Sequence, residues 1–199
     1  MKLINRIFRF IAEPKKAFEQ EANTPFSDAV KYVAILGALN LLLSAVTSAI
    51  SLKAQASILT AFGFDQVAEI LLKNSASLTS SLIMTPLTYL GMGVMLLMVI
   101  LWYHIFIYIF GGRQGIKNTA KVILYGYTPV MVFSWLPLIG MFAGIWSYAL
   151  YVLGFIKLQK MKTSRAVFAV ILAIIVPIIL IAILAFLLIA GLIFVLASA

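Results

Sequence analysis

The chain has 199 residues, of which 64% are hydrophobic and 11% are charged, and its mean hydropathy is +1.12. Soluble domains carry about 25% charged residues, so this composition excludes a soluble globular domain and indicates a polytopic membrane protein. The absence of cysteine excludes disulfides, thiol nucleophiles and thiolate metal sites. The formal net charge of +9 is interpreted as a topology signal rather than a nucleic-acid site, because the positions of basic residues orient membrane spans.

Residues 1–28 hold no apolar run long enough to cross a bilayer, and we expect them to form a cytoplasmic amphipathic segment. One helical face collects the apolar residues Leu3, Ile4, Ile7, Phe8 and Ile11. We expect this helix to end before Pro14. Two arrangements stay open: an interfacial helix held by anionic lipid, or a short helix packed beneath the spans. In the first arrangement the residues at the membrane interface are Arg6, Ile7, Phe8 and Arg9.

Residues 29–199 are expected to form a five-span transmembrane domain. The spans are predicted at about residues 28–51, 82–110, 119–136, 141–156 and 166–197. The polar stretch between the first two spans is predicted to carry a short amphipathic helix around Val67, Ile70 and Leu71. The expected fold class is therefore all-α, a polytopic membrane helix bundle with an amphipathic N-terminal helix.

Prolines lie inside the third and fifth predicted spans and in the turn between the third and the fourth. Pro129 breaks the third span, and a tight turn beginning at Pro137 makes the third and fourth spans a hairpin. The fifth stretch holds about thirty uncharged residues, more than a hydrocarbon core of about 30 Å requires at about 1.5 Å per residue. We therefore expect the fifth helix to tilt, to kink at Pro177 or to protrude.

The basic residues are distributed unevenly over the predicted connections. With five spans and the amino terminus inside, thirteen of the fifteen Lys and Arg residues fall on inner segments, and the outer segments hold only Lys53 and Lys73. This positive-inside bias predicts a cytoplasmic amino terminus and a carboxyl terminus outside. A basic inner face also attracts anionic lipids or acidic protein surfaces.

The sequence offers few groups for catalysis. No Asp or Glu lies inside a predicted span and there is one histidine, so paired carboxylates, a catalytic triad and a multi-ligand metal site are excluded within the membrane. We therefore expect no enzyme and no cofactor. His104 shares a helical face with Tyr108 and Gly111. Two interpretations of His104 stay open: a neutral histidine hydrogen-bonded to a neighbouring span, or a pH-sensing or ligand-contacting residue.

A set of short motifs completes the pattern. Pro14 and Phe18 form a Pro-x-x-x-Phe segment, and the later motif residues are His104, Gly111, Gly112, Gly115, Ala120, Gly126, Tyr127 and Pro129. Tyr108 and Tyr125 share helical faces with members of this set. The arrangement resembles the Yip-domain family of five-span membrane proteins, named for the interaction of its eukaryotic members with Ypt/Rab small GTPases. The chain lacks the long polar amino-terminal region of those members and is similar to the short bacterial and archaeal branch.

The resemblance implies a non-catalytic protein of a prokaryotic plasma membrane that organises membranes or recruits protein partners, with a small GTPase as the partner by analogy. The alternative is a transporter or channel for small solutes, ions or lipids, with a path along the broken third span and His104. Glycine-lined faces and the long fifth span leave a homodimer open.

Overall fold

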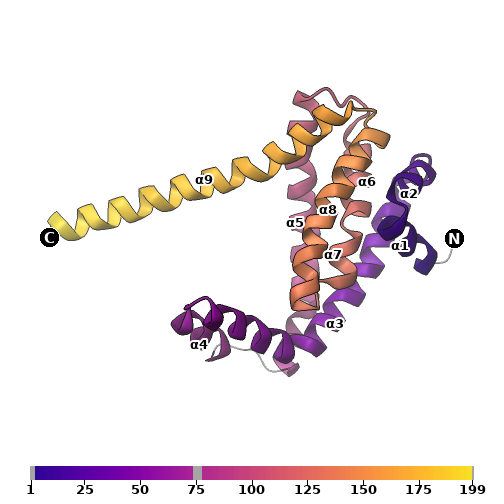
Figure 1. Cartoon of the computed structure of the whole chain (residues 1–199). Coiled ribbons are helices and arrows are strands. Elements are labelled where there is room, and N and C mark those ends of the chain that lie inside the picture. The colour runs from indigo at the N-terminus through magenta and orange to yellow at the C-terminus, as the bar shows by residue number, and fades with distance from the viewer. Residues whose placement is uncertain (1–2, 74–77, 199) are drawn as a thin grey trace.

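A computed structural model describes residues 3–73 and 78–198 of the protein. These residues form α-helices and no strand, in agreement with the predicted all-α fold. The helices are α1 (Leu3–Ala12), α2 (Pro14–Glu21), α3 (Phe26–Ala61), α4 (Asp65–Lys73), α5 (Leu78–Ile109), α6 (Ile116–Gly126), α7 (Thr128–Phe133), α8 (Pro137–Leu158) and α9 (Thr163–Ser198). Figure 1 shows α3, α5, α6, α7 and α8 side by side as a bundle, with α1 and α2 packed against one side of it.

Four helices in the described part of the chain are long and apolar enough to cross a membrane. They cover Phe26–Thr47, Ile83–Ile109, Ile139–Leu158 and Thr163–Gly191. The protein is therefore an all-α, multi-pass membrane bundle. The stretch predicted as the third span forms two shorter helices, α6 and α7, which follow one another along α8 (Figure 1) and both contact it. The described residues thus contain four continuous candidate spans, and the stretch predicted as the third of five spans is broken into two helices.

The break between α6 and α7 follows from Pro129. Proline has no backbone N–H, so the carbonyl of Tyr125, four residues earlier, loses its helical partner. The Thr128 hydroxyl donates a hydrogen bond to that carbonyl instead. It also lies 3.0 Å from the hydroxyl of Tyr32 on α3. The polar groups released by the break are satisfied inside the protein, as an apolar environment requires.

Glycines allow α6 and α8 to approach closely. A Cβ added at Gly126 would lie 2.6 Å from a ring carbon of Tyr151. A Cβ added at Gly154, on α8, would lie 2.6 Å from the side chain of Val122 and 2.9 Å from Phe18. A side chain of each helix therefore packs against a glycine of the other helix. Small residues permit such close packing between membrane helices.

The helices α1 and α2 share the core of the bundle. Phe10 and Phe18 are fully buried, with ring centroids 5.1 Å apart, and Phe10 stacks on Tyr125 at 4.9 Å. Full burial of one such side chain stabilises the packing by about 1.5–3 kcal/mol. Phe10 is not among the residues predicted for the apolar stripe, but it lies three residues after Ile7 and seven after Leu3, so it extends that stripe at one edge.

The predicted stripe is itself divided between two environments. Leu3 and Ile7 pack against the core, whereas Ile4 and Phe8 are 63% and 66% exposed. The helix α1 is therefore packed on the protein with part of its apolar surface facing outward, and its contact with anionic lipid stays a prediction.

The far end of the bundle is formed by α3 and α4. The helix α3 continues to Ala61, ten residues past the predicted end of the first span, because no helix-breaking residue intervenes. The predicted short helix is present as α4, which packs on α3 with Ala56 and Ala68 buried.

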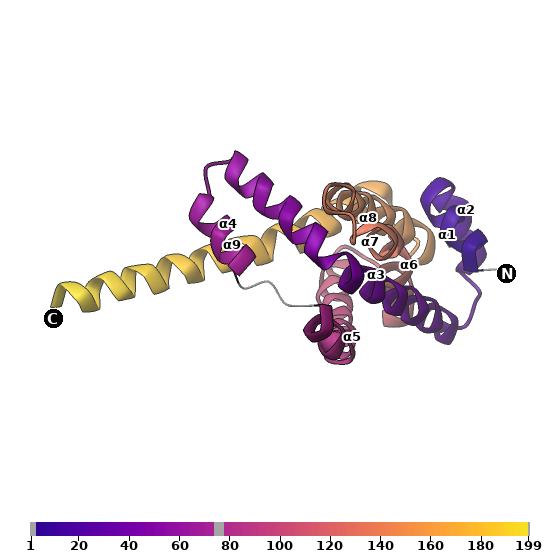
Figure 2. The same cartoon turned by 90° about the horizontal axis from the view of Figure 1, so that it is seen from below.

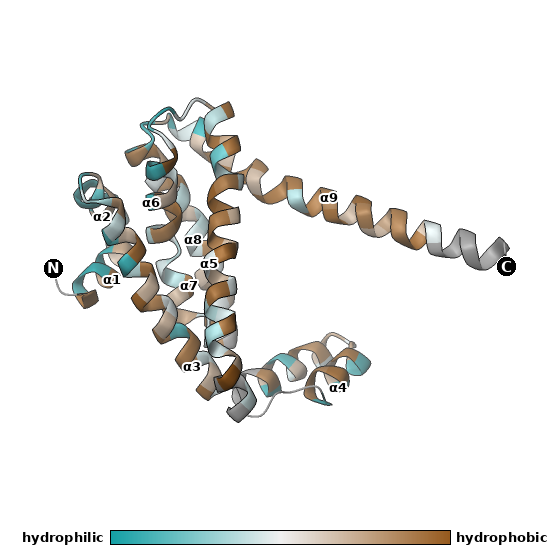
Figure 3. Ribbon diagram, turned by 180° about the vertical axis from the view of Figure 1, so that it is seen from behind, coloured by the Kyte–Doolittle hydropathy of each residue, from teal (hydrophilic) through white to brown (hydrophobic). Residues whose placement is uncertain are grey.

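The last helix leaves the bundle. The first turns of α9 pack on α5 and α8, and beyond Pro177 the helix projects away from the bundle, on the side opposite α1 and α2 (Figures 1 and 2). Pro177 deprives the Ala173 carbonyl of its helical donor, and Trp102 Nε1 donates to that carbonyl at 2.8 Å. The projecting part is apolar along its length (Figure 3). The helix α9 is continuous through Pro177, and its tilt and the position of its end relative to the bilayer stay predictions.

Candidate functional site

Two polar clusters lie near one end of the bundle. This end, which we call the basic end, also carries the α5–α6 and α8–α9 connections (Figure 1). Its basic residues are Arg113, Lys117, Lys157, Lys160, Lys162 and Arg165. Figure 3 shows hydrophilic residues gathered on these connections and on α1 and α2.

The first cluster is built around Glu21, the last residue of α2, which is 3% exposed. Its Oε1 lies 2.8 Å from Arg6 Nε on α1, in an ion pair that is not aligned as a hydrogen bond. Its Oε2 accepts a hydrogen bond of 3.0 Å from the Tyr125 hydroxyl on α6. A buried carboxylate left without partners costs several kcal/mol. These two contacts offset the desolvation cost of burying the Glu21 carboxylate.

Lys121 lies one turn before Tyr125 and is 3% exposed. Its ammonium donates to the carbonyls of Ala22 and Thr24, both at 2.8 Å. These carbonyls follow the carboxyl end of α2, where a cation is favoured by the helix dipole and by the unpaired carbonyls. Lys121 therefore fastens the α2–α3 connection to α6.

Aromatic rings surround this ion pair. The Arg6 guanidinium carbon lies 5.6 Å from the ring centroid of Tyr32 and 5.9 Å from that of Tyr125. Both separations fall within the range of cation–π attraction. We call these residues the Glu21 cluster: Arg6, Glu21, Tyr32, Lys121, Tyr125 and Thr128. They connect α1, α2, α3, α6 and α7.

The second cluster shapes the glycine-rich connection after α5. Gly111 has a φ of +97°, which a glycine adopts at little cost. The N–H of Gly112 donates to the carbonyl of Ile107 at 2.8 Å, and the N–H of Gly111 donates to that of Tyr108 at 3.2 Å. This pair of bonds is a Schellman motif, so the glycines end the helix α5. Gly115, with a φ of +81°, precedes α6.

Gln159, after α8, holds this connection from the other side. Its side-chain oxygen accepts from the N–H of Gln114 at 2.9 Å, and its Nε2 donates to the Gly115 carbonyl at 2.8 Å and to Thr119 Oγ1 at 2.9 Å. Thr119 Oγ1 in turn lies 2.9 Å from His104 Nδ1. Because the Thr119 oxygen accepts from Gln159, its own proton is available to Nδ1, an arrangement that favours a histidine protonated on Nε2.

The predicted site residues fall into two groups. His104 and Tyr108 lie near the end of α5, and Gly111, Gly112 and Gly115 lie in the α5–α6 connection that follows. The Arg113 guanidinium carbon lies 3.8 Å from the Tyr108 ring centroid. The other group lies at the end of α6 and in α7, and contains Tyr125, Gly126, Tyr127 and Pro129. Tyr125 joins the Glu21 cluster, Gly126 and Pro129 shape the backbone, and Tyr127 ends α6.

The residues predicted for the membrane interface also separate. Arg6 pairs with buried Glu21, and Ile7 packs against the core. Phe8 is exposed, and Arg9 donates a hydrogen bond to Gln20. Phe8 thus presents its side chain to the surroundings, while the other three contact the protein.

Sequence reasoning missed Glu21, Thr128 and Gln159. Glu21 lies in a charged stretch that gives no sign of burial, and Gln159 lies in a basic connection. The available signal was the spacing of Lys121 and Tyr125 on one helical face, which places two polar groups toward a common neighbour.

Comparison with known proteins supports the resemblance found in the sequence. The family model of the Yip1 domain matches residues 8–187, which include α2 to α8, the second half of α1 and most of α9. Comparisons with curated proteins and with solved structures give no match. The match covers far more than half of the chain, and the protein therefore belongs to the Yip1 domain family.

Proposed function

We propose that the protein is a non-catalytic adaptor of a prokaryotic plasma membrane, which recruits a protein partner or organises the membrane through its basic end. In this proposal residues 1–28 are a cytoplasmic amphipathic segment and residues 29–199 form the five-span domain. The observation that carries the proposal is the docking of α1 and α2 by the Glu21 cluster, which leaves the apolar side chains of Ile4 and Phe8 facing outward.

The proposed topology has the amino terminus inside and the carboxyl terminus outside. The α5–α6 and α8–α9 connections lie at one end of the bundle and α4 at the other, and α1 and α2 pack against its side, nearer to the connections than to α4 (Figure 1). This placement agrees with the charge bias, because Lys53 and Lys73 are on α3 and α4 beyond the predicted first span. The broken helix α6–α7 supplies the fifth crossing.

The basic end suits an acidic partner. Arg113, Lys117, Lys160, Lys162 and Arg165 are exposed there. A surface of this kind attracts anionic lipid headgroups and steers acidic proteins toward it. A small GTPase is the partner that the family relation suggests.

The alternative function is a transporter or channel along α6–α7. Its basis is the broken helix inside the bundle. Two observations favour the adaptor over it: Thr128 and Pro129 are buried, and the carbonyl released by Pro129 is already bonded by the Thr128 hydroxyl. His104 contacts Thr119 in the second cluster rather than the break. Flux of ions, small solutes or labelled lipid through reconstituted vesicles is the measurement that would support the transporter.

The experiment that tests the adaptor uses the absence of native cysteine. A photo-crosslinker is attached through Gln114→Cys, at an exposed residue of the α5–α6 connection, and through Lys53→Cys as a control at the far end. Maleimide accessibility first establishes on which side of the membrane each site lies. The proposal predicts a specific protein adduct from position 114 and none from position 53. Adducts to lipid alone at both positions would contradict recruitment of a protein, and a self-adduct would identify the homodimer.

A further inference from the structure

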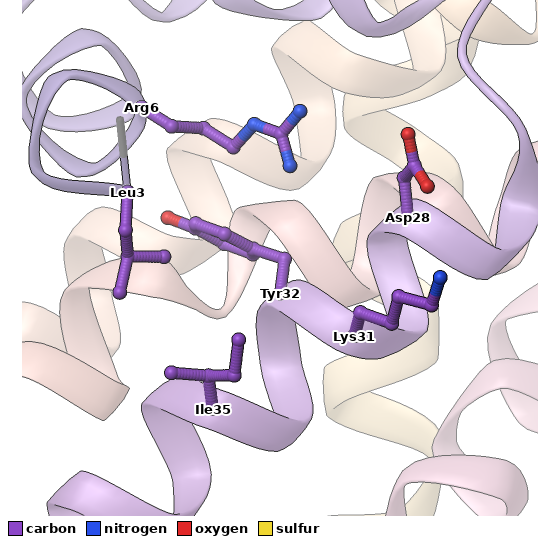
Figure 4. A pocket seen from close by; sticks show the side chains of 6 residues that line it. All are labelled: Leu3, Arg6, Asp28, Lys31, Tyr32 and Ile35. Atoms are coloured by element: carbon purple, nitrogen blue, oxygen red, sulfur yellow. The ribbon is translucent and has the colours of Figure 1, made fainter. Parts of the chain in front are cut away.

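A groove of about 220 Å³ lies between α1 and the first turns of α3. It is lined by Leu3, Arg6, Asp28, Lys31, Tyr32 and Ile35. Figure 4 shows the charged ends of Arg6, Asp28 and Lys31 on one side of it and Leu3 and Ile35 on the other, with the ring of Tyr32 between them. The groove is therefore polar at one end and apolar at the other, which matches the polar headgroup and apolar chain of an amphiphile.

The position of the groove matches the depth of a lipid headgroup. Asp28 and Lys31 lie in the first two turns of α3, where the membrane-crossing stretch Phe26–Thr47 begins. Ile35 is one turn further along, about 6 Å deeper in the bilayer for a helix that crosses it. Its side chain is 55% exposed. A headgroup at Lys31 would therefore have its glycerol and acyl chains alongside Ile35.

The charges of the groove have both signs. The Glu21 carboxylate forms its ion pair with Nε of Arg6. The terminal nitrogens of the Arg6 guanidinium face the groove (Figure 4). Lys31 is exposed and, within the described residues, forms no ion pair. Asp28 adds one carboxylate. After Arg6 and Glu21 are set against each other, the lining residues keep one positive group, Lys31, and one negative group, Asp28, which the ammonium of Lys121 outside the lining also attracts.

We propose that this groove binds a zwitterionic phospholipid whose headgroup carries a phosphate and a primary ammonium, as in phosphatidylethanolamine. The phosphate accepts hydrogen bonds from Lys31 and the Arg6 terminal nitrogens, the ammonium donates to Asp28, and an acyl chain lies along Leu3 and Ile35. The assignment depends on the insertion of α3 into the membrane and is independent of the adaptor function.

The carboxylate of Asp28 sets the selectivity. An anionic headgroup such as phosphatidylglycerol satisfies the two cations but offers no cation to Asp28. A choline headgroup has the positive charge but no N–H to donate. Only the ethanolamine headgroup among these three satisfies every charged group of the groove.

Native mass spectrometry of the purified full-length protein tests the proposal. The protein is equilibrated in detergent micelles with equimolar dioleoyl phosphatidylethanolamine, phosphatidylglycerol and phosphatidylcholine, and the retained lipids are counted. The wild type is expected to retain one phosphatidylethanolamine in preference to the other two. Retention of the three lipids in equal proportion overturns the proposal.

Charge variants then assign the contacts. Asp28→Asn is expected to lower the ratio of phosphatidylethanolamine to phosphatidylglycerol roughly three- to tenfold, the effect of one partly exposed charge-assisted hydrogen bond. Lys31→Gln is expected to reduce retention of both lipids, and Lys31→Arg to restore it. Asp65→Asn and Lys53→Gln, exposed at the far end, are the matched controls. An unchanged ratio in an Asp28→Asn protein that melts at the wild-type temperature overturns the assignment.

Soluble competitors separate a lipid from a free phosphate ligand. Inorganic phosphate and glycerophosphoethanolamine lack acyl chains, so neither is expected to displace the lipid at millimolar concentration. Displacement by either one overturns the lipid assignment and identifies a site for a soluble phosphate compound.

Discussion

The hydroxyl of Tyr125 donates a 3.0 Å hydrogen bond to Glu21, a residue 104 positions away in the sequence. This bond and the Arg6 ion pair hold α1 and α2 against the broken helix α6–α7. The amphipathic amino-terminal segment is therefore part of the folded bundle, docked by this buried carboxylate together with the buried rings of Phe10 and Phe18.

Replacing Glu21 tests how much that carboxylate stabilises the fold. Glu21→Ala leaves the Arg6 charge and the Tyr125 hydroxyl without their partner, and we expect a loss of about 2–4 kcal/mol in the free energy of unfolding. Thermal unfolding followed by tryptophan fluorescence measures it. The matched control is Glu13→Ala, which removes an exposed ion pair with Lys16 and is expected to cost about 0–1 kcal/mol. Equal losses for the two variants would show that the cluster contributes no more than a surface pair.

The close approach of α6 and α8 predicts a steric effect. In Gly126→Ala the new Cβ meets the ring of Tyr151 at 2.6 Å, so we expect a loss of about 1–3 kcal/mol through overpacking. Gly144→Ala, on α8, is the control, because no atom lies within 4 Å of its added Cβ. Its stability is expected to stay within about 0.5 kcal/mol of the wild type. Replacing the ring of Tyr151 by a smaller side chain, in the double variant Gly126→Ala with Tyr151→Leu, is expected to recover part of the lost stability. No recovery would argue against this contact as the cause.

Gln159 is expected to control the order of the α5–α6 connection. Gln159→Ala removes hydrogen bonds to Gln114, Gly115 and Thr119, so the backbone of residues 110–115 loses its side-chain support. Hydrogen–deuterium exchange of this segment is expected to accelerate about tenfold or more. Gln66→Ala, exposed on α4, is the control and is expected to leave the segment unchanged. The same exchange rate in both variants would contradict the role given to Gln159.

Trp102 and Pro177 are expected to be thermodynamically coupled. Trp102 Nε1 donates to the Ala173 carbonyl that Pro177 leaves without a donor. In Pro177→Ala the new N–H takes that carbonyl, so the Trp102 bond is no longer needed there. Trp102→Phe should therefore cost about 1 kcal/mol less in the Pro177→Ala background than in the wild type. Additive effects in this double-mutant cycle would exclude the coupling.

The sequence predicted the features that depend on local pattern. The all-α membrane fold, the short helix α4, the interruption at Pro129 and the excess length of the fifth stretch all follow from hydropathy, proline chemistry and helix dimensions. The extension of α3 to Ala61 was missed because polar residues were interpreted as the end of the helix rather than of the span.

The candidate site was harder to predict because its contacts are long-range. Phe10 lies at the edge of the apolar stripe of α1, and its spacing from Leu3 and Ile7 does not reveal that it packs on Tyr125. Glu21 is charged and adjoins other charged residues, so burial becomes favourable only through partners on α1 and α6. Such pairings are properties of the tertiary structure and have no counterpart in a single-sequence pattern.

The central claim is that α1 and α2 are docked on the bundle rather than resting on lipid alone. Hydrogen–deuterium exchange of the vesicle-reconstituted protein tests it, with wild type compared with Glu21→Gln and with the control Glu13→Gln. We predict that amides of residues 3–21 exchange at least tenfold faster in Glu21→Gln, whereas those of α8 and the control variant stay at wild-type rates. The same slow exchange of residues 3–21 in all three proteins would contradict docking through Glu21.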